Sequence, residues 1–150
     1  MRSFETIAEL KDLLGQEIGV SDWIAVTQER IQLFADATND HQWIHVDVER
    51  AKSGPFGATI AHGFFTLSLL PEMAASAFTV REARMGVNYG LNKVRFPAPV
   101  PSGSRLRGHF KLVGYEPLEG GAQITVQVTM EREGSDKPVC IAESLSRRYA

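Results

Sequence analysis

The sequence lacks most of the features that mark specialised classes of protein. Cys140 is the only cysteine in 150 residues, so no intrachain disulfide can form and a reducing compartment is expected. No apolar run approaches the ~20 residues that a membrane span needs. Glu9, Lys11 and Asp12 interrupt the N-terminal region where a signal peptide would carry its apolar segment. We therefore expect a soluble, cytoplasmic protein with no membrane association.

Strong charge and the common cofactor motifs are also missing. The formal net charge is -2, and the lysines and arginines are scattered along the chain. A nucleic-acid-binding protein normally shows a clustered basic face, so this class is not expected. The patterns HExxH, CxxC, GxGxxG and the P-loop are absent. We expect neither a metal nor a nucleotide cofactor.

The length and the 43% hydrophobic content fit one domain spanning residues 1–150. Helical signals fill the first half. Apolar spacing predicts a helix from Ser3 to Gly15, Thr27 should cap a second helix that ends near Asn39, and Asp47 should cap a brief one over 48–52. A short strand is expected over 21–26. The run 63–78 is apolar almost all round, which indicates a buried helix, and Pro71 should kink or break it.

The second half changes to a two-residue period. Residues 123–130 alternate strictly between polar and apolar types, residues 106–112 follow the same pattern, and 139–149 resembles a last strand. The alternation over 85–96 slips near Asn92, as a β-bulge would cause. Helices followed by antiparallel strands predict an α+β domain with a sheet wrapped around one buried helix. The exposed edge of such a sheet favours a homodimer.

Asp40 and His45 are the residues most typical of catalysis. A loop that holds a carboxylate near an imidazole can grip one water molecule between them. An isolated Asp at this point is more often a turn residue that satisfies backbone donors at the helix end, and a loop His often binds a nearby carbonyl. The spacing alone therefore favours a structural role for both.

Gly63 supplies a third element, because it opens the buried helix. A small residue there lets the helix approach the sheet closely. The unpaired amides and the positive dipole end of a helix N-terminus also suit a carbonyl oxygen that gains charge. The position of His62, immediately before this helix, favours a packing or capping role for its side chain. Lys93 and Arg95 are either surface charges or contacts for the phosphates of a large substrate.

Three other side chains are weaker candidates for a role in catalysis. His41 and His109 are expected to be solvated. Cys140 has no base adjacent in sequence, so a core position fits it better than a nucleophile.

Three segments together resemble the MaoC-like dehydratase family, the (R)-specific enoyl-CoA hydratases of the hot-dog fold. These are Asp40–His45 with Ala51, then Ile60–Phe64 with its His-Gly pair, then Arg95–Val100 with its Arg-Phe-Pro-x-Pro-Val run. The resemblance extends over the whole chain and includes the nodulation-protein-N-like branch. Many members have Asn-Pro where this chain has Gln42 and Trp43, and a Ser found further along the central helix in some members is missing near Pro71.

The resemblance implies a hydro-lyase that adds water to a trans-2-enoyl thioester of CoA or acyl carrier protein and gives an (R)-3-hydroxyacyl thioester, without a cofactor. Asp40 and His45 would be catalytic and Gly63 would form the oxyanion hole. Trp43, His62 and Arg95 are candidate substrate-binding residues, with Trp43 expected to reshape the loop and the acyl tunnel. A hot-dog acyl-CoA thioesterase and a non-catalytic acyl-binding or regulatory domain are the alternatives.

Overall fold

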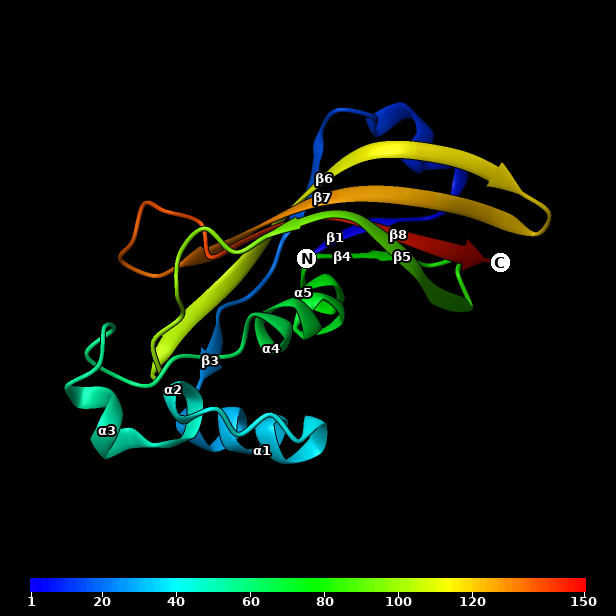
Figure 1. The fold of residues 1–150 in the computed structure, drawn as a ribbon. Helices are drawn as coiled ribbons and strands as arrows, with labels where there is room; N and C mark the ends of the chain where they lie inside the picture. Colours follow the sequence, from blue (N-terminus) through cyan, green and yellow to red (C-terminus); the bar gives the residue numbers. More distant parts are fainter.

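A curved antiparallel sheet forms one layer of the protein (Figure 1), and the computed structural model describes all 150 residues. The strands of the sheet follow the order β2-β6-β7-β8-β5, and β3 pairs with β6 beside β2. A separate pair, β1 with β4, is parallel. The strands are β1 (Arg2–Phe4), β2 (Glu17–Val20), β3 (Ile24–Val26), β4 (Phe78–Val80), β5 (Met85–Arg95), β6 (Ser104–Leu118), β7 (Gly121–Arg132) and β8 (Cys140–Tyr149).

The α-helices lie on one side of this sheet, with α4 and α5 directly beneath it and α1 to α3 in a further lobe, whereas the short 3-10 helix near the N-terminus lies above β6 in this view (Figure 1). Their bounds are η1 (Ala8–Leu13, a 3-10 helix), α1 (Gln28–Thr38), α2 (Trp43–Val46), α3 (Val48–Lys52), α4 (Gly63–Ser68) and α5 (Leu70–Ala77). Apolar side chains of β6 and β7 meet Phe65, Leu69 and Met73 in one buried cluster. The α+β prediction, with a sheet curved over a central helix, is confirmed. No helix is long and apolar enough to span a membrane.

The break predicted at Pro71 is confirmed. The central helix divides at Leu69, and Pro71 lies in the first turn of α5, where a missing amide proton does no harm. The expectation that this helix is buried all round is wrong. Phe65 and Met73 face the core, but Phe64 keeps 74% of its surface exposed.

The N-terminal expectations are wrong in their boundaries. Ser3 does not cap a helix, because it lies in β1 opposite Thr79, and only a 3-10 turn follows. The strand expected over 21–26 is confined to β3, and β2 precedes it unpredicted. The reason is non-local: Ser21 exchanges backbone and hydroxyl hydrogen bonds with Gly108 on β6, which bends the chain between the two short strands.

The local signals elsewhere are confirmed. The Thr27 hydroxyl accepts from the amide of Arg30 at 3.2 Å, and the Asp47 carboxylate accepts from the amide of Arg50 at 3.0 Å. The register of β5 with β8 shifts between Leu91 and Val94, where the bulge was expected.

Candidate active site

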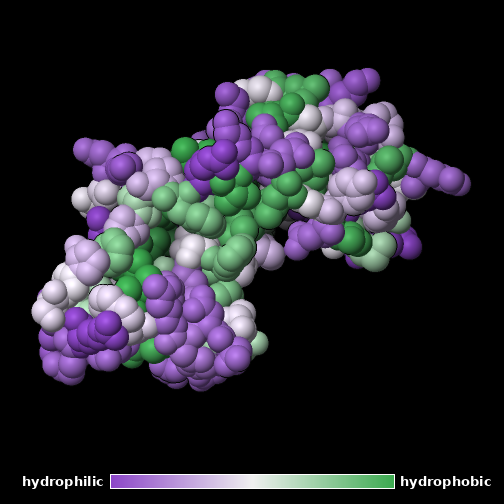
Figure 2. Space-filling view, viewed as in Figure 1, coloured by the Kyte–Doolittle hydropathy of each residue, from purple (hydrophilic) through white to green (hydrophobic).

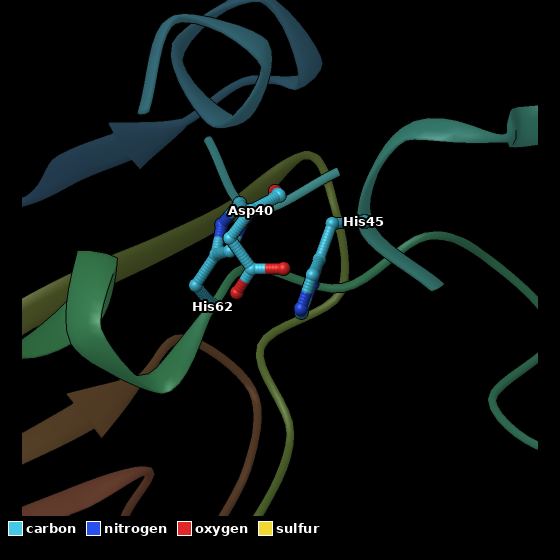
Figure 3. A group of neighbouring side chains, drawn as sticks. All are labelled: Asp40, His45 and His62. Carbon is cyan, nitrogen blue, oxygen red and sulfur yellow. The ribbon is translucent and has the colours of Figure 1, made fainter. Parts of the chain in front are cut away.

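Three polar side chains from three separate segments converge beside the start of α4 (Figure 3). Asp40 follows α1, His45 lies in α2, and His62 immediately precedes α4. A carboxylate oxygen and one ring nitrogen from each histidine all lie within 4.8 Å of one another. The structure therefore brings together residues that the sequence separates by more than twenty positions.

Asp40 is placed by the way α1 ends. Asn39 adopts the left-handed conformation with φ 58, a common way to stop a helix. The Asp40 amide then donates to the carbonyl of Ala35 at 3.1 Å, and its carboxylate accepts from the amide of Gln42 at 3.3 Å. Figure 3 shows the carboxylate next to the two imidazoles, which stack on each other. Asp40 thus has the turn role expected of such a residue, and its exposed carboxylate still faces His45.

His45 is held by the backbone just before α4. Its Nδ1 donates to the carbonyl of Ile60 at 2.7 Å, and only 7% of the residue is exposed. Because Nδ1 carries the proton, the neutral ring offers Nε2 as an acceptor. Burial lowers the pKa of His45, an effect to which nearby His62 adds, while the Ile60 carbonyl and the Asp40 charge oppose it. As pH falls, the His45 ring therefore stays neutral to a lower pH than an ordinary histidine side chain does.

His62 supports both members of the pair. Its Nε2 donates to the main-chain carbonyl of Asp40 at 3.0 Å, and its ring stacks on that of His45 with centroids 3.8 Å apart. The Phe34 ring packs on it at 4.9 Å. With 2% of its surface exposed, His62 has the packing role that its position favoured. A contact with substrate stays a prediction.

Gly63 lies at the N-terminus of α4 beneath the ring of Phe96. A Cβ at position 63 would lie 3.1 Å from that ring, so a small residue is needed for this approach. Gly63 also lines a cavity of about 280 Å³, together with Ile60, Ala61 and Pro97. The first amides of a helix have no acceptor within it, so the Gly63 amide is free for a group that enters this cavity.

The other two candidate substrate-binding residues lie outside this cluster. The ring of Trp43 packs against Gly54 and lies 4.2 Å from the Arg50 guanidinium, so it anchors the loop after α3. Arg95 is exposed at the end of β5 and donates to the Val94 carbonyl. Their roles toward substrate stay predictions.

The remaining histidines and the cysteine take secondary positions. His41 is exposed, as expected, and bonds to Asp36 at 2.8 Å. His109 is not simply solvated, because it lies 2.6 Å from a carboxylate oxygen of Glu131 on the neighbouring strand. Cys140 is fully buried, and burial raises the pKa of its thiol to about 11, which argues against a nucleophile.

The groups that orient Asp40 and His45 were not predicted from the sequence. The Ile60 carbonyl selects the tautomer of His45, and the Asp40 carbonyl binds His62. Backbone carbonyls carry no residue-type signal, so no pattern in the sequence could have indicated them. Phe96 is different: it lies inside the Arg95–Val100 segment that supported the resemblance.

Comparison with known proteins decides the family. The model of the MaoC like domain matches residues 9–134. The chain belongs to the MaoC-like family. This domain is 58% identical over 151 residues to 3-hydroxyacyl-thioester dehydratase Z of Mycobacterium tuberculosis, with all of both chains covered. It is 50% identical over 141 residues to Nodulation protein N of Rhizobium leguminosarum bv. viciae, covering 91% of this chain and 87% of that protein.

A solved structure supports the hot-dog architecture of this MaoC-like domain. R-hydratase PhaJ1 from Pseudomonas aeruginosa superimposes with a TM-score of 0.73 at 22% identity, over 96% of this chain and 85% of that one. The resemblance inferred from the three segments, including its nodulation-protein-N branch, is confirmed by these relatives.

The lowered pKa of His45 can be measured directly. In NMR titrations of the folded protein, the His45 ring should titrate below the usual histidine range, because burial disfavours its charged form. In the unfolded chain His45 has an ordinary histidine pKa and binds the proton at higher pH. The free energy of unfolding should therefore decrease as pH falls from that ordinary pKa to the lowered pKa of the folded state. His45→Gln should remove this part of the pH dependence. A His45 ring that titrates normally in the folded protein would contradict the burial argument.

Proposed function

We propose that this MaoC-like domain catalyses the reversible syn addition of water to a trans-2-enoyl thioester, which gives an (R)-3-hydroxyacyl thioester. The observation that carries the proposal is the placement of Asp40 and the free Nε2 of His45 side by side before the first amides of α4. The relative that is 58% identical is named a 3-hydroxyacyl-thioester dehydratase, and dehydration is the reverse of this reaction.

The two side chains are suited to hold one water molecule. An ionised Asp40 and a neutral His45 that is protonated at Nδ1 are both acceptors. A water between them donates one hydrogen to each, which leaves an oxygen lone pair for the substrate. The lowered pKa of His45 supports this state, because a protonated imidazole would donate to the water instead.

The steps balance without any further reactant. As the water oxygen bonds to Cβ of the enoyl group, one water proton passes to Asp40 and the π electrons move into the thioester. The enolate oxygen accepts a hydrogen bond from the Gly63 amide, an effect worth about 3 kcal/mol for one oxyanion donor. The proton held by Asp40 then passes through Nε2 of His45 to Cα, which returns both side chains to their starting state, so hydroxyl and hydrogen arrive on the same face.

The carrier of the acyl group is proposed to lie on the outer side of Gly63. Arg95 is exposed and precedes Phe96, whose ring covers Gly63, and in this proposal its guanidinium would meet phosphates of CoA or of an acyl carrier protein. Trp43 would act more remotely, through the loop that its ring anchors. The reaction is placed in the cytoplasm, where a free thiol such as Cys140 stays reduced.

The enzyme is further proposed to be a homodimer that pairs through β5. This strand forms one edge of the sheet, opposite the edge made by the short strands β2 and β3, and Met85, Val87, Tyr89 and Leu91 along it are all exposed. Figure 2 shows apolar surface gathered over this part of the molecule. An open apolar edge strand favours pairing with a second strand, and a two-fold axis would make the contact self-complementary.

Substitution of the pair tests the chemistry. Asp40→Asn and His45→Gln should each lower the rate of crotonyl-CoA hydration by about 100- to 10,000-fold, the usual contribution of a general acid or base. Loss of the conjugated-thioester absorbance measures the rate. Asp36→Asn on α1 and His41→Gln on the loop after it are matched controls, because these residues bond to each other next to Asp40, and both should behave as wild type. If Asp40→Asn and His45→Gln hydrate crotonyl-CoA normally, the assignment is wrong.

The oligomeric proposal is tested by sedimentation. Wild type should sediment as a dimer, and the double substitution Val87→Lys and Tyr89→Lys should give a monomer, since lysines on an edge strand oppose strand pairing. Lysine at Leu33, which is exposed on α1, serves as the control and should leave the dimer intact. A monomeric wild type would rule out this assembly.

A further inference from the structure

A second and larger cavity, of about 990 Å³, lies between the central helices and the sheet. One wall is apolar and comes from α4 and α5, including Leu67, Leu70 and Ala74. The opposite wall comes from β5, β6, β7 and β8, and it includes Met85, Tyr89 and Leu91 of the strand edge proposed to pair in the dimer. The cavity therefore starts one helical turn beyond Gly63 and continues to Phe78, at the end of α5.

The far part of the sheet wall is polar, which is unusual for the inner face of a sheet that covers an apolar helix. Its polar members are Asn88 on β5 and Ser144, Ser146 and Arg148 on β8. Asn88 pairs with Ser146, and Gly86 pairs with Arg148. These residues therefore form one polar patch around the Arg148 guanidinium.

Arg148 has no anionic partner within the chain. Four other arginines (Arg30, Arg81, Arg105 and Arg107) each pair with a carboxylate. Like that of Arg132, the Nε of Arg148 is buried without a hydrogen-bond partner, but only Arg148 of these two lines the cavity. Its guanidinium lies 5.4 Å from the centroid of the Phe78 ring. Burial lowers the pKa of Arg148. Arg148 is half-buried, and a partly desolvated charge without a counter-ion is unfavourable, so this position favours the arrival of an anion.

The cavity as a whole is positively charged. Arg84 and Arg148 both line it, and none of its 24 lining residues is an aspartate or glutamate. An anionic group that entered would meet two cations and the neutral donors of Ser144, Ser146 and Asn88. Arginine suits a carboxylate in particular, because its planar fork donates two parallel hydrogen bonds.

We propose that this cavity binds the acyl chain of the substrate and that Arg148 recognises a carboxylate at the far end of that chain. The preferred substrates would be 2-enoyl thioesters with a terminal carboxyl group. This inference rests on the proposed function, which puts the thioester oxygen at Gly63. The carrier phosphates lie on the other side of the thioester and do not reach Arg148.

The dimensions require a long chain. Residues 63–77 of the two helices span about 20 Å at the usual rise per residue. A short acyl group held at Gly63 therefore ends well before Arg148, and only a long one brings its terminal group to the guanidinium. The apolar wall of α4 and α5 would contact the methylene groups between the two ends.

Binding and turnover of two matched thioesters test the proposal. Saturated acyl-CoAs of equal, long chain length, one ending in a carboxylate and one in a methyl group, are titrated calorimetrically into the dimeric protein. Wild type should bind the carboxylate form about tenfold or more tightly, as expected for hydrogen bonds to a charged group. The corresponding enoyl-CoAs should show the same preference in kcat/KM.

Variants at neighbouring positions on β8 locate the effect. Arg148→Met should abolish the preference for the carboxylate form. Arg148→Lys keeps the positive charge but lacks the planar guanidinium, so it should retain part of the preference. The lysine variant also tests the proposal if the methionine variant does not fold. Arg147→Met is the control, because Arg147 does not line the cavity and its guanidinium donates to Gln123 on β7, and it should keep the full preference.

The outcomes separate this inference from the proposed function. Equal binding of the two thioesters by wild type, or a preference that survives Arg148→Met, overturns the carboxylate site, and a carboxylate of the second copy would then be the partner of Arg148. Failure of wild type to hydrate both crotonyl-CoA and the two long enoyl-CoAs contradicts the proposed function instead, while the calorimetric preference would still report on Arg148.

Discussion

The geometry of the candidate active site depends on the hydrogen bond from Nδ1 of His45 to the carbonyl of Ile60, 2.7 Å long. This bond sets the tautomer and turns the acceptor nitrogen toward Asp40. The same residue, Ile60, donates its amide to the carbonyl of Ile44 at 2.9 Å. Two bonds thus join α2 to the strand-like segment that leads into α4, and they set the distance between the imidazole and the first helical amides.

Other contacts stiffen this link. The Gln28 amide donates to the carbonyl of His45 at 2.7 Å and accepts from the Thr59 hydroxyl at 2.6 Å, so the start of α1 is tied to both sides of the site. At its other end, α1 positions Asp40, whose carbonyl is held by His62. The proposed catalytic groups are therefore supported by polar side chains and backbone groups of the same lobe, while the sheet supplies the apolar support beneath α4.

The parts of this architecture that depend on local chemistry were predictable from sequence. Thr27, Asn39 and Asp47 act on their own backbone neighbourhood, and the alternation over 123–130 encodes a strand with one buried face. The parts that depend on distant partners were not. Ser3 belongs to a strand only because residues 78–80 lie beside it, and Phe64 was expected in the core because the pattern cannot show which side of a helix lacks a covering element.

The same distinction applies to the site. Residue types at Asp40, His45 and Gly63 indicated the chemistry, but their spacing alone could not exclude ordinary turn and packing roles, and in the structure Asp40 and Gly63 also have those roles. Arg148 could not be singled out from the sequence, because β8 carries polar residues on both faces. Only the register with β5 and β7 shows that Arg148 faces the cavity, whereas Arg147 faces away.

The central claim is that a single water, held between Asp40 and His45, adds to one face of an enoyl thioester. Hydration of crotonyl-CoA by the wild-type protein in D2O, with the configuration of the product determined at both carbons, tests it most directly. The predicted product is the (R)-3-hydroxy thioester with deuterium at Cα on the same face as the new hydroxyl. Anti addition, an (S) product, or release of free CoA without hydration would contradict it.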